Sequence, residues 1–141
     1  MSTIHPMLVH FPIALLSTGL IFDVIASFSR RAELQRVGWW MMVSGTVSLI
    51  LGLASGLGAE ADVVINTGAQ AVLDSHKQFA FLLAGLVTSA FFWRLSCRGA
   101  LPSRRVWLFW SLYGAGICLL WVVAWFGGVL VHEHGVSAFV P

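Results

Sequence analysis

Five histidines are the residues of this chain whose type and position point most directly to chemistry. They are His5 and His10 near the start of the sequence, His76 in the middle, and His132 and His134 near the end. Neutral imidazole is the commonest metal ligand among the side chains, and it also serves as an axial ligand of haem iron. The set therefore predicts a bound cofactor or metal ion. The alternative is an interfacial or helix-capping role, which we favour for His5 or His132 taken alone.

Four apolar segments must position these histidines. The 141 residues are 58% hydrophobic and 10% charged, with a mean hydropathy of +0.87, whereas about a quarter of the residues in a soluble domain are charged. A helix of about 20 residues crosses a hydrocarbon core of about 30 Å. The segments at about 7–28, 37–58, 76–95 and 106–132 are long enough to do so. We predict an all-α fold, an integral membrane four-transmembrane-helix bundle that forms a single domain over residues 1–141.

The basic residues predict the orientation of this bundle. Seven of the eight lie in or beside the first and third loops, and loops rich in lysine and arginine stay in the cytoplasm. Both termini are therefore expected outside, on the periplasmic side of a bacterial inner membrane, with all five histidines toward that face. Without a basic face the chain is not expected to bind nucleic acid. The two cysteines lack CxxC spacing and do not support a thiolate zinc site or a redox dithiol.

A weak internal repeat suggests which histidines pair. Residues 10–20 and 76–86 match at His, Ala, Leu, Gly and Leu, and both segments are expected to cross the membrane in the same direction. A parallel repeat of this kind would place His10 and His76 at equal depth, facing one another across the bundle centre. These two are therefore the expected main ligands, with His5 and His134 as a second pair or as supporting residues.

Other side chains within the spans bear on a cofactor site. Asp23 lies about one turn inside the end of the first span and is expected to pair with Arg30 or Arg31, with a proton-relay role as the alternative. No second buried charge is expected to accompany it. Trp121 and Trp125, one turn apart, are expected to pack between helices or to line a cofactor. Further aromatic side chains expected at the walls of a cofactor site are Phe11, Phe79 and Phe81.

Two motifs resemble those of a known family. The segments HPMLVHFPIAL at residues 5–15 and GGVLVHEHGV at residues 127–136 are similar to motifs of a bacterial family of four-helix inner-membrane domains of unknown function. The resemblance covers nearly the whole chain. An aromatic residue often stands in that family where this chain has His132, which makes His132 the weakest ligand candidate. Relatives fused or adjacent to Rieske and cytochrome-type domains imply electron-transfer partners. The residues that match the family's histidine pattern are His5, His10, His76 and His134.

The leading functional hypothesis is a membrane b-type cytochrome-like electron-transfer protein that binds haem b near the periplasmic face. Two histidine ligands leave no open position on the iron, so an electron carrier or binding subunit is expected in preference to a catalyst. Its partners would be the quinone pool and a periplasmic or membrane redox protein, and the sequence is compatible with a homodimer. The alternatives are a copper or zinc site in which three or four of the same histidines converge, and a structural accessory subunit of a respiratory complex.

Overall fold

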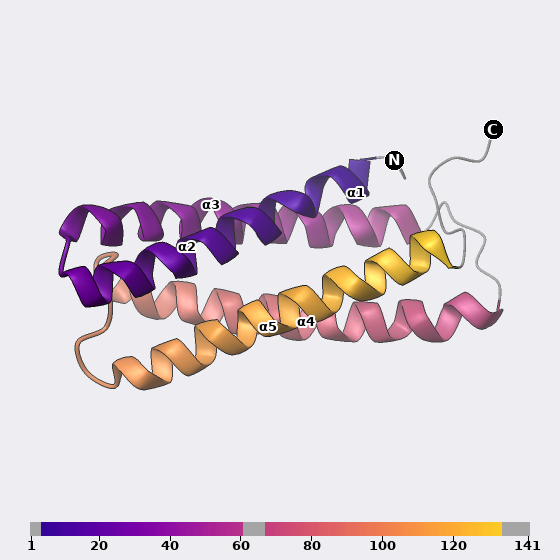
Figure 1. Cartoon of the computed structure of the whole chain (residues 1–141). Helices are drawn as coiled ribbons and strands as arrows, with labels where there is room; N and C mark the ends of the chain where they lie inside the picture. The colour runs from indigo at the N-terminus through magenta and orange to yellow at the C-terminus, as the bar shows by residue number, and fades with distance from the viewer. Residues whose placement is uncertain (1–3, 61–66, 134–141) are drawn as a thin grey trace.

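The described part of the chain is entirely helical. The computed structural model describes residues 4–60 and 67–133, and Figure 1 shows their arrangement. Helices α1 and α2 follow one another almost without interruption, so that four long helices result, each long and apolar enough to cross a membrane. The predicted four-helix membrane fold is confirmed for these residues. The helices are α1 (Ile4–Leu8), α2 (His10–Ser29), α3 (Ala32–Glu60), α4 (Thr67–Ser96) and α5 (Val106–His132).

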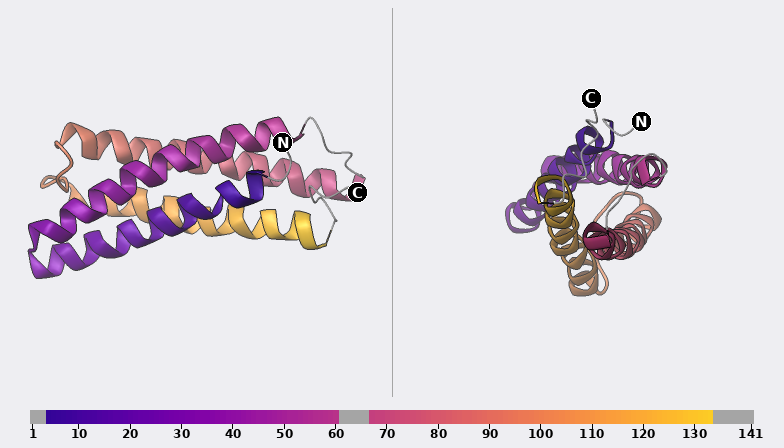
Figure 2. Two further views of the ribbon diagram at one scale, coloured as in Figure 1. Left: turned by 90° about the horizontal axis from the view of Figure 1, so that it is seen from above. Right: turned by 90° about the vertical axis from the view of Figure 1, so that its right-hand side faces the viewer.

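The four long helices form two hairpins. Helix α2 packs along α3 and α4 packs along α5, while smaller contacts join α3 to α4 and α2 to α5. The result is a ring of helices in which α2 and α4 lie on a diagonal (Figure 2). We call α1, α2 and α3 the first hairpin, and α4 and α5 the second hairpin. Because both hairpins make their internal turn at the end drawn on the left in Figure 1, α2 and α4, the first long helix of each, run in the same direction.

The two ends of the bundle carry different side chains. The connections within the hairpins, at Arg30 and Arg31 and at residues 97–105, lie at the end drawn on the left in Figure 1. We call this the arginine end. His5 and His76 lie toward the opposite end, which we call the histidine end. This grouping follows from the up-and-down order of the helices and agrees with the sequence prediction that the histidines share one side.

Two helix starts differ from their predicted positions. Helix α4 begins at Thr67, so His76 lies in its third turn and does not open it. Ala69, Gln70, Ala71 and Leu73 before His76 are good helix formers, and Gln70 donates a hydrogen bond to Asp74 one turn later. At the first span, helical structure starts at Ile4, and Val9 separates α1 from α2. Pro12 has no amide hydrogen to donate one turn back, which explains an interruption at this point.

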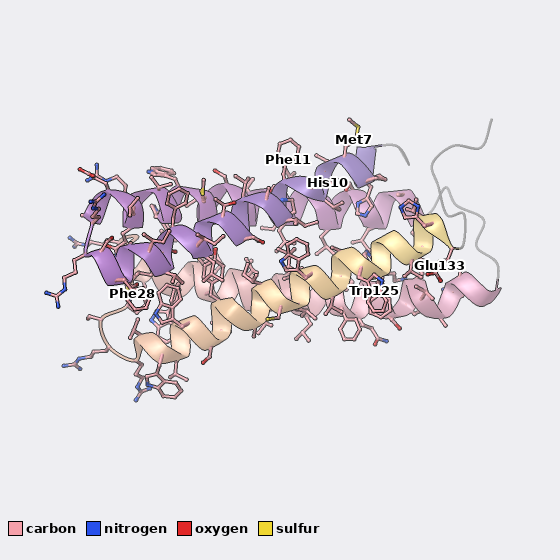
Figure 3. The ribbon with its side chains drawn as sticks, in the orientation of Figure 1. Met7, His10, Phe11, Phe28, Trp125 and Glu133 are labelled. Atoms are coloured by element: carbon pink, nitrogen blue, oxygen red, sulfur yellow. The ribbon has the colours of Figure 1, made fainter. Side chains whose placement is uncertain are left out.

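The core lies at mid-depth, where the two hairpins meet. Leu16 and Met42 from the first hairpin pack with Leu83, Val87 and Phe109 from the second, and all five are at most 1% exposed. Apolar side chains also cover much of the outer surface, as lipid contact requires. Met7 and Phe11, for example, project away from the other helices (Figure 3).

Candidate cofactor site

His5 is held by a residue of its own hairpin. Its Nδ1 atom lies 2.9 Å from the Ser55 hydroxyl of α3. That hydroxyl uses its hydrogen to bond the carbonyl of Gly52 at 2.7 Å, so the imidazole must be the donor to Ser55. The proton of a neutral His5 is therefore on Nδ1, and Nε2 carries the free lone pair. Gly56 makes room for the ring, because a Cβ atom there would lie 2.9 Å from its Cε1 atom.

His76 is held in the same way within the second hairpin. Its Nδ1 atom lies 3.1 Å from the backbone carbonyl of Val123 in α5. A carbonyl only accepts hydrogen bonds, so Nδ1 of His76 is the donor and Nε2 again carries the lone pair. Gly127 lies beside this ring, with the position of its missing Cβ 3.5 Å from Cε1.

The structure brings His5 and His76 together. Both rings are partly buried, and both lie toward the histidine end of the bundle. They approach from different hairpins, along the diagonal that joins α1 and α2 to α4. The arrangement offers two imidazole Nε2 atoms, each with its ring orientation fixed by a partner on Nδ1, as is usual for metal-ligating histidines.

The structure does not bring His10, the expected partner, close to His76. The His10 side chain is exposed, and its Nδ1 atom donates to the carbonyl of Pro6 at 2.6 Å in the preceding turn. Positions 5 and 10 are about 140° apart around a helix, so only one of them faces the bundle centre. His132 is also exposed, while His134 lies outside the described residues. Among residues 4–60 and 67–133, no group of three histidine, cysteine or acidic side chains is placed to hold a metal ion.

A buried ion pair lies at the other end of the same diagonal. The Arg94 guanidinium of α4 donates from Nη1 to Oδ2 of Asp23 and from Nη2 to Oδ1, the latter at 2.8 Å. Both side chains are fully buried. Arg94 also donates to the carbonyls of Gln35 at 2.9 Å and Gly99 at 3.0 Å. Its guanidinium carbon lies 5.6 Å from the centre of the Trp39 ring. Nearly every donor of the guanidinium is therefore satisfied inside the protein.

Two glycines make the ion pair possible. A Cβ atom at Gly38 of α3 would overlap the Asp23 carboxylate, so only glycine leaves space for it there. Gly99 has a φ angle of +80°, a conformation that glycine adopts without strain, and its carbonyl is one of those that receive Arg94. Gly38 thus leaves space for the carboxylate of the pair, and the Gly99 carbonyl accepts a hydrogen bond from its guanidinium.

This ion pair corrects two predictions. Asp23 pairs with Arg94 and not with Arg30 or Arg31, and a second buried charge does accompany it. Sequence reasoning missed Arg94 because it counted the residue among the arginines of a polar loop. The available signal was charge: Asp23 and Arg94 have opposite charges and both lie inside the ends of two apolar spans that meet at the same end of the bundle.

The two diagonal pairs have the same sequence spacing. His5 precedes Asp23 by 18 residues, and His76 precedes Arg94 by the same number, which is about five turns of helix. A whole number of turns returns a side chain to the same face, and Val9, between α1 and α2, keeps right-handed helical backbone angles (φ −67°, ψ −19°), so the phase is carried across the interruption. Each of the two parallel helices therefore presents a histidine and a charged residue to the bundle centre, about 27 Å apart along the axis.

The predicted aromatic walls are mostly elsewhere. Trp121 and Trp125 are 58% and 70% exposed, so they neither pack between helices nor line an internal site of this chain. Phe11 and Phe81 are more than half exposed as well. Their spacing within apolar helices did not distinguish a lipid-facing side from an inner one. Phe79 differs, since it stacks on Phe126 between α4 and α5, with ring centres 5.6 Å apart.

Comparison with known proteins identifies the family but no characterised relative. The model of a family described as "Predicted membrane protein (DUF2231)" matches residues 1–139. No curated protein and no solved structure is significantly similar to the chain. Four apolar helices and a match over almost the full length agree on the class of protein. The chain thus belongs to the DUF2231 family of predicted membrane proteins.

Proposed function

We propose that this protein is a haem-binding electron carrier of the membrane, in which His5 and His76 would hold the haem iron. The observation that carries the proposal is the matched state of the two rings: each donates from Nδ1 to a fixed acceptor and keeps the Nε2 lone pair for a ligand. The exposed His10 also donates from Nδ1 to a carbonyl, but within its own helical segment. Only His5 and His76 combine this arrangement with partial burial and a partner on another helix, on two hairpins and at one end of the bundle.

The donor set fits haem better than a bare metal ion. Copper and zinc sites usually take three or four protein ligands, and among the residues described here no third ligand accompanies the two imidazoles. Haem iron receives four nitrogens from the porphyrin and needs only two from the protein. Two histidines, one from each hairpin, meet that requirement. The proposal therefore replaces His10 of the expected pair with His5.

The neighbours of the rings have a defined part in this proposal. Ser55 and the Val123 carbonyl hold the Nδ1 protons, which orients the rings and makes the Nε2 atoms better donors to a metal. Haem with two imidazole ligands transfers single electrons and has no iron position open to substrate. Because both histidines lie toward one end of the bundle, electrons would enter and leave on that side. The partner classes are the quinone pool and a redox protein at the same face.

Absorption spectroscopy of histidine variants tests the proposal. The protein is produced under haem-replete conditions, purified in detergent, and recorded oxidised and after reduction with dithionite. We expect a Soret band and sharp bands in the reduced state, and we expect His5→Ala and His76→Ala each to lose the low-spin spectrum. His132→Ala, which removes an exposed histidine at the same end, is the matched control and should retain it.

Other outcomes would redirect the assignment. A colourless wild-type protein would rule out haem, and elemental analysis of the same sample would then test for copper or zinc. Loss of the spectrum in His10→Ala, with His5→Ala unchanged, would restore the pairing that the sequence repeat suggests.

A further inference from the structure

Each histidine is fixed only within its own hairpin. His5 bonds to Ser55 of α3, and His76 bonds to Val123 of α5. Neither bond crosses from one hairpin to the other. The distance between the two Nε2 atoms is therefore set by how the first hairpin lies on the second. A site that depends on both rings needs that relationship to be defined to within about 0.5 Å.

The strongest directional links between the hairpins are at the arginine end. Most core contacts are apolar and have no preferred direction, and at mid-depth the buried Tyr113 hydroxyl of α5 donates one neutral hydrogen bond to the Leu16 carbonyl of α2 at 2.9 Å. The Lys77–Glu60 ion pair near the histidine end is about one-third exposed, and a pair in such a position contributes little. By contrast, the buried guanidinium of Arg94 donates hydrogen bonds to both carboxylate oxygens of Asp23 and to the Gln35 carbonyl. A two-point contact of this type specifies distance and angle together.

We propose that Asp23 and Arg94 are positioning residues, whose buried ion pair fixes the register of α2 against α4 and thereby sets where His5 lies relative to His76. This inference rests on the proposed cofactor role of the two histidines. On both helices the histidine and the charged residue are 18 residues apart, so the alignment of the charged residues at one end also determines the alignment of the histidines at the other. When Asp23 is level with Arg94, two parallel helices of this length also bring His5 level with His76.

Buried ion pairs suit such a role. They add little net stability compared with a well-packed apolar pair, because both charges lose their hydration, but they tolerate few alternative arrangements. The length of the helices amplifies any error. A change of about 5° in the angle between α2 and α4 would move the far ends by about 2 Å over about 27 Å of helix.

Distance measurements by pulsed electron paramagnetic resonance test this inference without a cofactor. Spin labels are attached to cysteines at Met7 of the first hairpin and Trp125 of the second, which are 71% and 70% exposed. The native Cys97 and Cys118 are first replaced by serine and alanine. We expect Arg94→Lys, which keeps the charge but not the planar two-point contact, to shift the mean distance by about 2 Å or to broaden the distribution correspondingly.

Two controls and one further variant make the result specific. Labels at Met7 and Leu57, both within the first hairpin and exposed, should give the same distance in every variant. Lys77→Gln, which breaks the exposed ion pair, should leave the distance between the hairpins unchanged. Asp23→Asn is a second test of the buried pair, should Arg94→Lys fail to fold. An unchanged distribution between the hairpins in a folded variant of either residue overturns the inference.

A second readout separates this inference from the proposed function. In haem-loaded protein, Arg94→Lys should shift the g-values of the low-spin iron and the reduction potential, although it lies about 27 Å from the histidines. If wild type binds haem and neither the distances nor the g-values change, the positioning role fails while haem binding stands. If wild type is colourless and the distances shift, haem binding fails while control of the histidine positions stands.

Discussion

Removing the Asp23 carboxylate leaves a full positive charge inside an apolar bundle. In Asp23→Leu, Arg94 keeps its bonds to the carbonyls of Gln35 and Gly99 but loses its only counter-charge among the described residues. Breaking a buried pair in this way costs about 3–5 kcal/mol in unfolding free energy. Arg94→Leu should cost a similar amount, because it strands the carboxylate instead.

The double variant separates this reasoning from simple loss of packing. With both charges replaced by leucine, no unpaired charge remains. The Gln35 carbonyl keeps its partner within the α3 helix, so the cost reduces to the Gly99 carbonyl that lacks a donor, about 1–3 kcal/mol at most. We therefore expect the Asp23→Leu/Arg94→Leu protein to be more stable than predicted by adding the two single losses, by about 2 kcal/mol or more.

Unfolding in mixed detergent micelles measures these values. Dodecyl sulfate is titrated into protein in a mild detergent, and tryptophan fluorescence is followed. Trp39 lies against Arg94 and so reports directly on the site. A loss below about 1 kcal/mol in either single variant, or strict additivity in the double variant, would refute the view that two buried charges depend on one another.

Two further predictions concern the same end of the bundle. Gly38→Ala should lower the unfolding free energy by about 1–3 kcal/mol, because its Cβ atom overlaps the Asp23 carboxylate. The control is Gly114→Ala, where no atom lies within 4 Å of the added Cβ; it should be neutral or stabilise the helix by up to about 1 kcal/mol. Equal losses of unfolding free energy in the two variants would contradict this assignment. The arginine end is expected in the cytoplasm, so a membrane-impermeant maleimide should label Cys97 in inverted vesicles but not in intact spheroplasts. Cys118, within α5, should stay unlabelled in both preparations. Labelling of Cys97 in intact spheroplasts would reverse the assigned orientation.

The fold was largely predictable because lipid imposes a simple rule. Long apolar runs must be helical in a bilayer, and this rule found all four long helices. The same rule does not predict the residues at which the helices begin and end. Residues 68–75 contain four good helix formers but are too polar to be recognised as part of a span, and α4 starts nine residues earlier than expected. The extension of α4 also moved His76 from a helix start into the body of the helix.

The candidate site was only half predictable. His76 was singled out from the sequence and is partly buried against α5. The other partly buried histidine at that end is His5, because helical structure extends upstream of the apolar segment that the sequence defined. The sequence pattern did not distinguish His5 from His10 as a candidate ligand. The two residues differ in their angular positions on the helix. The Asp23–Arg94 pair required knowing that α2 and α4 face one another across the bundle. No local pattern within either span contains that information.

Imidazole rescue of glycine variants tests the central claim most directly. His5→Gly and His76→Gly each remove one ligand and leave a space that free imidazole fits. If these two residues hold haem iron, each variant should lose the low-spin spectrum of the wild-type protein and recover it when imidazole is added. The account is contradicted if both variants keep the wild-type spectrum without imidazole, or if wild-type protein from haem-replete cells contains no haem.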